Sequence, residues 1–283
     1  MARTKFAIIG GDYRYKLLSE ILQDSNDNVN IFGNKYLSNS SDISACLKNS
    51  DIVIAPIPIS KDNVNVFMDS TYSLSIEDLI EEMTRANVKN IICGVVNNDI
   101  RRKFNSSGIE IFDLFDLEEV AINNAIPTAE GAIMTAIQES DKALFNSLSL
   151  VIGYGRCGKV LSNMLLGIGS NVSVTYRKKS DEAYINAYNL TPIKIDLLDA
   201  HIQKFDFIFN TAPALVLNNE TLKRIRKDSL IIDLAQAPGG LDYNYARELN
   251  LKAKYCPGLP GRVAPYTAAQ ILKTAIIDIA HDL

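Results

Sequence analysis

The sequence has no tryptophan and few residues of the kinds that most often carry catalysis or bind metals. It contains two histidines, His201 and His281, and neither stands in a motif, which disfavours a 2-hydroxy-acid dehydrogenase because such enzymes move a hydroxyl proton through a histidine. The cysteines form no Cys-x-x-Cys pair and have no histidine nearby; they are Cys46, Cys93, Cys157 and Cys256. We therefore expect neither a metal site nor a disulfide framework.

Long apolar runs and basic blocks are also lacking. No stretch approaches the roughly 20 apolar residues of a membrane helix, and a net charge of −4 without Lys/Arg clusters argues against a nucleic-acid surface. The apolar run at 6–9 ends in a glycine turn, unlike a signal peptide. We expect a cytoplasmic protein without membrane or nucleic-acid partners, and a length of 283 residues predicts about two domains.

Short Val/Ile-rich runs alternate with helical patterns along the whole chain. Nearly continuous apolar strands are typical of parallel sheets covered on both faces. The predicted strands are 6–9, 29–32, 51–54, 90–93, 109–112, 148–152, 172–176, 191–195, 205–209, 230–233 and 251–255. The predicted helices between them are 15–23, 76–85, 99–104, 159–166, 220–226 and 243–249, while 38–44 is expected to be a polar loop.

Two longer helices are predicted to join the halves. One begins at Pro127, which suits a first helical turn, and extends to Leu144; the other follows Pro265. The predicted fold is α/β, with two doubly wound parallel-sheet domains. A flavodoxin-like substrate domain comprises residues 1–126 plus the helix 265–283. A second domain, residues 127–264 including the linking helix, contains a glycine-rich strand–helix turn at 153–158 and is predicted to be an NAD(P)-binding Rossmann domain. The active cleft is expected between these two crossovers.

The most informative motif is the run from Gly153 to Gly158, with Gly153, Gly155 and Gly158 in Gly-x-Gly-x-x-Gly spacing between a strand and a helix. Gly153 allows the tight turn, Gly155 lets a pyrophosphate approach the backbone, and Gly158 allows close helix–strand packing. A helix beginning near Arg156 presents free N–H groups to phosphates. We predict dinucleotide binding here, with Tyr154 and Cys157 as the remaining contacts. Cys157 is expected to have a lowered pKa.

The next strand ends in Tyr176, Arg177, Lys178 and Lys179, where an NAD enzyme usually has an acid that holds the ribose 2′-hydroxyl. An arginine can instead bind a 2′-phosphate through a charge-assisted fork. The sequence therefore favours NADP over NAD, with solvated charges at a strand end as the alternative.

Three further loops follow strands at the carboxyl edge of the second domain, where ligands of such folds bind. The first two are expected to line the nicotinamide half of the cofactor, and Gln236 and the third loop are expected to contact the substrate. The residues concerned are Asn210, Thr211, Ala212 and Pro213 in the first loop, Leu234, Ala235 and Gln236 in the loop 233–240, and Pro260 and Arg262 in the loop 256–265.

In the first domain the turn after the first strand has the wrong spacing for a dinucleotide. Asp12 is expected to cap the next helix and exclude a phosphate. We predict that this turn faces the substrate, with Arg14 as a carboxylate binder or simply an exposed side chain. Thr128 and Glu130 are expected at the start of the linking helix, with Glu130 the best functional carboxylate and a helix cap as its alternative. The candidate catalytic residues are Glu130, Arg14 and Arg262.

Together these segments resemble the family of the dipicolinate synthase A subunit over essentially the whole chain. The residues that carry the resemblance are 10–14, 119–132, 153–158, 233–235, 238–240 and 257–265. The loops after Asp233 and Cys256 are also similar to those of alanine dehydrogenase and transhydrogenase. The loop 56–62 departs from the family in having less glycine.

The resemblance implies a sporulation enzyme of the mother-cell cytoplasm. It would oxidise a dihydrodipicolinate, derived from 4-hydroxy-tetrahydrodipicolinate of the lysine pathway, to dipicolinate with NADP as hydride acceptor. The family works with a flavoprotein-like B subunit. Two alternatives stay open: an alanine dehydrogenase-like amino or hydroxy acid dehydrogenase, and a non-catalytic NADP-binding scaffold for the flavoprotein. Homo-oligomerisation is also left open.

Overall fold

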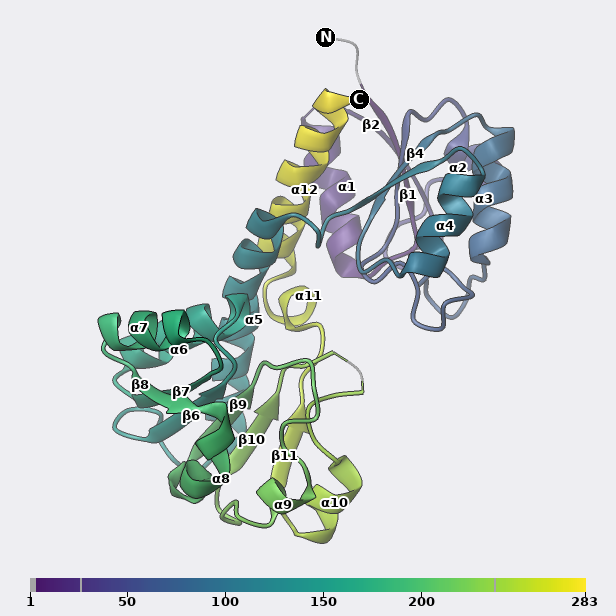
Figure 1. The fold of residues 1–283 in the computed structure, drawn as a ribbon. Helices are drawn as coiled ribbons and strands as arrows, with labels where there is room; N and C mark the ends of the chain where they lie inside the picture. Colours follow the sequence, from purple (N-terminus) through teal and green to yellow (C-terminus); the bar gives the residue numbers. More distant parts are fainter. Residues whose placement is uncertain (1–3, 26, 237) are drawn as a thin grey trace. The chain divides into compact units, whose positions relative to one another are not determined.

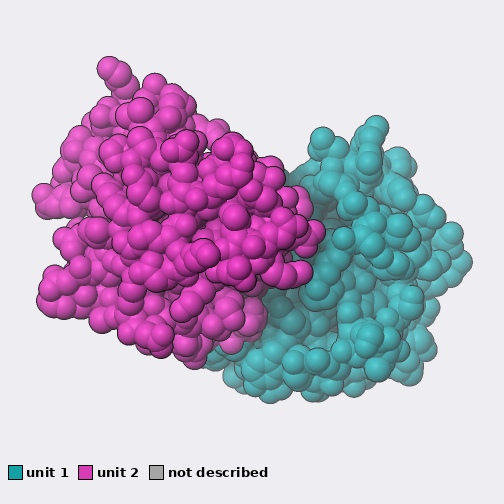
Figure 2. Space-filling view, turned by 90° about the horizontal axis from the view of Figure 1, so that it is seen from below, with its two compact units in different colours: residues 1–123, 264–283 teal, residues 124–263 magenta. Residues whose placement is uncertain are grey.

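The computed structural model describes residues 4–25, 27–236 and 238–283. The chain divides into two compact units, unit 1 with residues 1–123 and 264–283, and unit 2 with residues 124–263 (Figure 2). Within the described residues, no helix combines the length and apolarity that crossing a membrane requires.

Unit 1 is built on a five-stranded parallel sheet in the order β2-β1-β3-β4-β5 (Figure 1). This is the flavodoxin-like order, in which the connections reverse direction between β1 and β3. The strands are β1 (Lys5–Ile9), β2 (Asn28–Phe32), β3 (Ile52–Ile54), β4 (Asn90–Cys93) and β5 (Glu110–Asp113).

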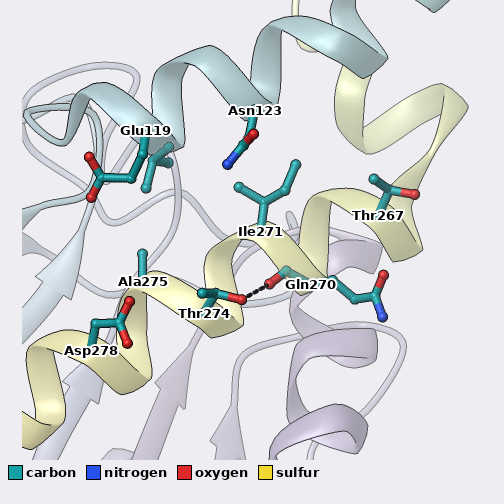
Figure 3. Close-up of a pocket in the computed structure, with 9 residues that line it drawn as sticks. Glu119, Asn123, Thr267, Gln270, Ile271, Thr274, Ala275 and Asp278 are labelled. Atoms are coloured by element: carbon teal, nitrogen blue, oxygen red, sulfur yellow. Dashed lines mark hydrogen bonds between the residues drawn. The ribbon is translucent and has the colours of Figure 1, made fainter.

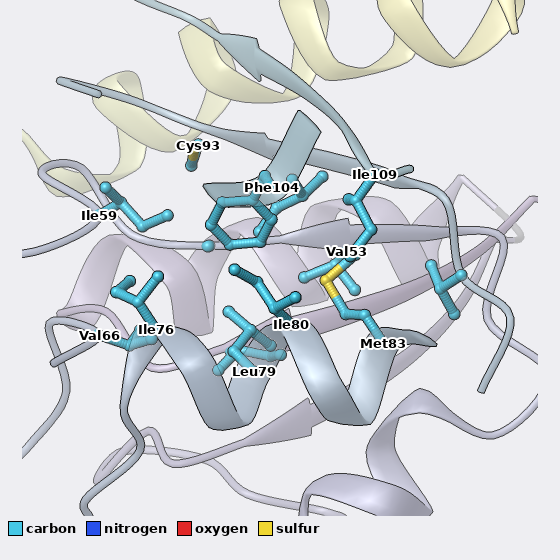
Figure 4. Packing of buried hydrophobic residues seen from close by; sticks show 14 of the residues in the cluster. Val53, Ile59, Val66, Ile76, Leu79, Ile80, Met83, Cys93, Phe104 and Ile109 are labelled. Carbon is cyan, nitrogen blue, oxygen red and sulfur yellow. The ribbon is translucent and has the colours of Figure 1, made fainter. Parts of the chain in front are cut away.

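Helices cover both faces of the unit 1 sheet because successive strand residues point to opposite sides. Phe6 and Ile8 of β1 pack with α1 and α12, whereas Ala7 and Ile9 pack with α2, α3 and α4. Figure 4 shows the second face, where the apolar side of α3 lies over the sheet. The helices are α1 (Tyr13–Asp24), α2 (Ile43–Leu47), α3 (Ile76–Arg85), α4 (Asn98–Ser106) and α12 (Pro265–Asp282).

Unit 2 contains a six-stranded parallel sheet in the order β11-β10-β9-β6-β7-β8. Counted from β6, this is the Rossmann order 3-2-1-4-5-6, with the reversal between β6 and β9. The strands are β6 (Leu148–Ile152), β7 (Asn171–Tyr176), β8 (Thr191–Lys194), β9 (Phe207–Asn210), β10 (Leu230–Asp233) and β11 (Lys252–Tyr255).

One face of this sheet packs with α5, α6 and α7, and the other with α8, α9 and α10. The bounds are α5 (Glu118–Glu139), α6 (Arg156–Ile168), α7 (Lys179–Ala187), α8 (Leu198–His201), α9 (Asn219–Leu222), α10 (Tyr243–Glu248) and α11 (Leu259–Val263), with short 3-10 turns at Ile195–Leu197 and Ile202–Lys204. The predicted fold class, two doubly wound parallel-sheet domains of flavodoxin-like and Rossmann type joined by long helices, is confirmed.

The linking helix differs from its prediction. α5 begins at Glu118 rather than at Pro127, which lies inside the helix, and it ends at Glu139, before Leu144. A proline in a helix interior removes one backbone hydrogen bond. Small residues on either side of it, such as Ala125 and Ala129, are buried, and this packing offsets the lost bond.

Four shorter helices were also missed: α2, α7, α8 and α11. α2 overlaps the segment predicted as a polar loop; Asp42 caps it, and Cys46 and Leu47 are buried in the core. Short helices of this kind owe their helicity to tertiary packing rather than to local propensity, so periodicity does not reveal them.

A charged network ties together the amino-terminal ends of β6 and β9 in unit 2. Asp206 accepts hydrogen bonds from Lys142 Nζ at 2.8 Å, Arg226 at 2.7 Å and the Leu148 N–H at 3.0 Å. Burial by itself would raise the pKa of Asp206, but these donors outweigh it and lower the pKa to about 2.

Replacing Asp206 with asparagine is expected to destabilise unit 2 by about 1–2 kcal/mol at neutral pH, because three donors lose a charged acceptor. A carboxyl group with a lowered folded-state pKa stabilises the fold above its unfolded pKa. The difference in unfolding free energy between the Asp206 protein and the asparagine variant should therefore be largest above about pH 4 and shrink as the pH falls toward 2. Urea unfolding at pH 7, 4 and 3 measures it. Asp196→Asn, which breaks an exposed pair with Lys194, is the control, and an equal loss there would contradict the prediction.

Candidate functional site

The carboxyl ends of β6 and β9 lie side by side in the unit 2 sheet, at the point where its connections reverse direction. Ligands of open α/β sheets bind outside the strands at such a point. The residues that leave these two strands are Gly153 and Thr211. The Thr211 N–H and Oγ1 both donate to the Ile152 carbonyl oxygen, at 3.0 and 2.9 Å. The two loops are thereby held together at the predicted cofactor turn.

Two glycines of the turn are required by the fold. Gly153 has φ of +98°, and a Cβ there would lie 2.8 Å from Thr211 Oγ1. A Cβ on Gly158 would lie 2.0 Å from the Gly153 carbonyl oxygen, which only displacement of the backbone could relieve. These contacts match the tight turn and the close helix–strand packing expected from the motif.

Gly155 has a different role, because apart from its own and its neighbours' backbone no described atom lies within 4 Å of the place where its Cβ would stand. It is the N-cap residue of α6, which begins at Arg156 as predicted, and among the described residues no side-chain hydrogen bond caps this end. At α1, by contrast, the Asp12 carboxylate occupies the same position. Open space therefore lies beside Gly155 at the N-terminus of α6, an arrangement that fits the pyrophosphate of a dinucleotide.

Cys157 does not behave as expected from its place at a helix N-terminus. Burial raises the pKa of its thiol, and the nearby Arg156 only partly opposes this. The predicted lowering of the Cys157 pKa is therefore wrong, because desolvation of the thiol outweighs the Arg156 charge. The neighbouring Tyr154 is largely buried, and Lys159 Nζ lies 5.4 Å from its ring centroid. Sequence reasoning missed this cation close to the phosphate turn.

The end of β7 carries the residues predicted to select the cofactor. Arg177 and Lys178 are exposed, and Lys178 precedes α7. An acid lies close by after all: Glu182, in the first turn of α7, raises the pKa of Tyr176. Sequence reasoning missed Glu182 because it belongs to the unpredicted helix α7.

The loops after β9 and β10 meet at a buried polar cluster. Asn210 and Asp233, the last residues of these strands, are both 0% exposed and are joined by a hydrogen bond of 2.8 Å from Asn210 Nδ2 to Asp233 Oδ1. Of the other predicted contacts in these loops, Ala235 is buried, Thr211, Ala212 and Leu234 are half-buried, and Pro213 and Gln236 are exposed. Ala237 of the predicted loop lies outside the described residues.

The last predicted loop contains the short helix α11, which corrects the prediction of an irregular segment. Pro260 is buried within it and Arg262 is exposed. Leu259 of α11 lies against Gly131 of α5, where a Cβ would come within 3.0 Å of the leucine side chain. Gly131 is thus the sequence signal that could have revealed this packing.

In unit 1, Asp12 is the N-cap of α1, as predicted, and accepts the Arg14 N–H at 3.0 Å. The same carboxylate binds the Arg14 guanidinium, with Nε–Oδ1 and Nη2–Oδ2 distances of 2.9 and 2.8 Å. Arg14 also donates to the Ile57 carbonyl oxygen and is only 8% exposed, so it is not the exposed side chain of the alternative. The adjacent Tyr15 hydroxyl is buried without a hydrogen-bond partner among the described residues.

Thr128 and Glu130 were predicted at the start of the linking helix. They lie inside α5 instead, because the helix starts earlier, at Glu118. Thr128 Oγ1 donates to the Asn124 carbonyl oxygen one turn earlier, at 2.8 Å. Glu130 is exposed and has no helix-capping role, which removes the structural alternative considered for it.

A groove of about 230 Å³ in unit 1 runs between the start of α5 and α12. In Figure 3, Glu119 and Asn123 project from α5 and Asp278 from α12. Its lining includes two carboxylates but no basic residue and none of the predicted site residues, so it is unsuited to an anionic ligand. Among the described residues, no three His, Cys, Asp or Glu side chains gather as a metal site.

Comparisons with known proteins agree on one family. Residues 5–115 match the model of the N-terminal domain of the dipicolinate synthase A subunit. The chain is 32% identical to the dipicolinate synthase A subunit of Bacillus subtilis (strain 168), over 99% of this chain and 96% of that protein. It is also similar to two crystal structures. The A chain of dipicolinate synthase from Bacillus subtilis is 30% identical with a TM-score of 0.88, covering 100% of this chain and 97% of that one. The A-subunit structure from Bacillus halodurans is 28% identical with a TM-score of 0.86, covering 98% and 97%.

Proposed function

The chain belongs to the family of dipicolinate synthase A subunits, and from that premise we propose that it is an NADP-dependent oxidoreductase subunit that converts a dihydrodipicolinate to dipicolinate. The observation that carries this proposal is the open space beside Gly155, the N-cap residue of α6, at the β6/β9 switch point. A dinucleotide pyrophosphate fits such a site.

The proposed reaction removes a hydride from one ring carbon and a proton from its neighbour, and the ring becomes aromatic. NADP, when bound, would accept the hydride. Because aromatisation supplies driving force, orientation of the ring and one weak base are sufficient. This suits a chain whose two histidines stand in no motif.

We assign roles to residues of each unit as part of the same proposal. In unit 2, Arg177 and Lys178 would hold the 2′-phosphate, Arg262 a substrate carboxylate, and Glu130 would accept the proton. In unit 1, the Asp12–Arg14 pair would serve substrate binding, with the Tyr15 hydroxyl, which has no hydrogen-bond partner among the described residues, as a further donor beside it. Further proposed substrate contacts are Thr128, Gln236 and Pro260.

The relatives from Bacillus subtilis and Bacillus halodurans are named as subunits of dipicolinate synthase. We propose that this chain likewise works with a flavoprotein-like B subunit, in the mother-cell cytoplasm of a sporulating bacterium. The substrate would come from 4-hydroxy-tetrahydrodipicolinate by loss of water.

Single-turnover mixing tests the function. The full chain, with and without the flavoprotein-like partner, is loaded with NADP and mixed with the dihydrodipicolinate. We expect NADPH absorbance to appear at about 340 nm together with dipicolinate. Alanine, tested in parallel, should give no signal. A chain that NADP stabilises but that reduces none of it would be a scaffold, and a flavoprotein-like partner that makes dipicolinate equally well without this chain would also contradict the proposal.

A further inference from the structure

Asp233, at the end of β10, is a completely buried carboxylate with four neutral donors. Its Oδ1 accepts from Asn210 Nδ2 at 2.8 Å and from the Ala235 N–H at 3.1 Å. Its Oδ2 accepts from the Gly240 N–H at 2.7 Å and from the Tyr243 hydroxyl at 2.6 Å. A buried carboxylate is costly unless its oxygens are satisfied, and here each oxygen has two donors.

The four donors come from one strand, one loop and one helix. Asn210 belongs to β9, and its Oδ1 also accepts the Ala212 N–H at 3.2 Å, so the same amide shapes the turn that follows β9. Ala235 and Gly240 stand at the two ends of the loop after β10, and Tyr243 is the first residue of α10. One carboxylate therefore joins both loops that follow the central strands.

Two glycines allow this convergence. A Cβ on Gly240 would lie 1.9 Å from Asn210 Nδ2, and one on Gly239, which has φ of +97°, would lie 2.8 Å from Asp233 Oδ2. The Gly240 carbonyl oxygen in turn accepts the Leu217 N–H at 3.1 Å, which ties the far end of the first loop to the second.

The Tyr243 hydroxyl is a dependable donor in this cluster. Burial and the Asp233 carboxylate both raise the pKa of Tyr243 well above its ordinary value, so the phenol keeps its proton at every pH at which the protein would work.

We propose that Asp233 is a positioning residue that, with Asn210 and Tyr243, holds the loops after β9 and β10 in the shape that binds the nicotinamide half of the dinucleotide. This rests on the proposed cofactor function. The adenosine half would bind at the other side of the switch point, from Gly155 to Arg177, and none of the four donors to Asp233 comes from that segment. A buried charge kept for its geometry, rather than for stability, is consistent with the general behaviour of buried polar networks.

The test compares two ligands on the full chain: NADP, and 2′,5′-ADP, which carries only the phosphorylated adenosine half. Tyr243→Phe removes one donor and Asp233→Asn removes the charge. We expect both variants to bind NADP about 10- to 100-fold more weakly, with less than twofold change for 2′,5′-ADP. Tyr245→Phe, two residues along α10, is the matched control and should change neither affinity.

Equal weakening of both ligands, with a lower melting temperature, would show that the network only supports the fold, and unchanged NADP binding would also overturn the proposal. Tyr243→Phe keeps the test decisive if Asp233→Asn does not fold. If the unaltered chain bound neither ligand, the proposed cofactor function itself would fail, which is a distinguishable result.

Discussion

Replacing Gly155 with alanine is expected to weaken NADP binding by about 10- to 100-fold while leaving the fold intact. The φ of Gly155 is −80°, which alanine adopts freely, and its Cβ would enter open space. That space is where a pyrophosphate would approach the first N–H groups of α6. A methyl group placed there costs about 1–3 kcal/mol of binding by overpacking. Titration calorimetry measures the affinity, and thermal unfolding monitors the fold.

Gly158→Ala in the same turn is the matched substitution with the opposite outcome. Its Cβ would meet the Gly153 carbonyl oxygen at 2.0 Å, so the backbone must move, at a cost of about 3 kcal/mol of stability. The two variants should therefore separate: Gly155→Ala loses ligand affinity, and Gly158→Ala loses thermal stability. If Gly155→Ala kept full affinity, the dinucleotide would not lie against this turn.

Replacing Arg177 with alanine is expected to remove the preference for NADP over NAD. A charge-assisted bond to a phosphate contributes about 1.5–3 kcal/mol, so NADP affinity should fall about 10- to 100-fold while NAD affinity stays nearly constant. The readout is the ratio of the two dissociation constants, measured at one salt concentration because exposed charges are screened.

Lys227→Ala is the control for net charge. Lys227 is also exposed in unit 2, but it precedes β10 and so lies at the opposite edge of the sheet. The Lys227→Ala variant should leave the ratio of the NADP and NAD dissociation constants unchanged.

Glu182→Gln should raise the preference for NADP, because it removes a carboxylate that lies beside Tyr176. An unaltered chain without any preference would contradict the assignment of NADP.

Local sequence patterns were sufficient to predict most of the secondary structure. The run from Leu148 to Ile152 was predicted as a strand from its apolar residues, and in the strand every residue after the first is buried. α3 has the predicted bounds because its apolar residues recur at helical spacing. Glycine spacing likewise located the turn before α6. Patterns of this kind depend on residues close together in the chain, so they can be read without the fold.

The predictions that the structure overturned have a common origin: they depend on contacts that local sequence patterns do not report. α5 continues through Pro127 because its small residues are buried, and α11 packs where Gly131 admits Leu259. The pKa of Cys157 depends on burial that no local pattern reports. Glu182 comes near Tyr176 only through α7.

The strands, the order of elements that leads to two parallel sheets, and the glycines at the turn before α6 can all be recognised in the amino-acid sequence. The partners of the polar groups cannot: Asp233 accepts hydrogen bonds from Asn210, Gly240 and Tyr243, and Asp12 pairs with Arg14, only in the folded chain. Backbone conformation follows largely from neighbours in the chain. Hydrogen bonds, desolvation and charge pairing depend instead on distances through space, which exist only once the chain has folded.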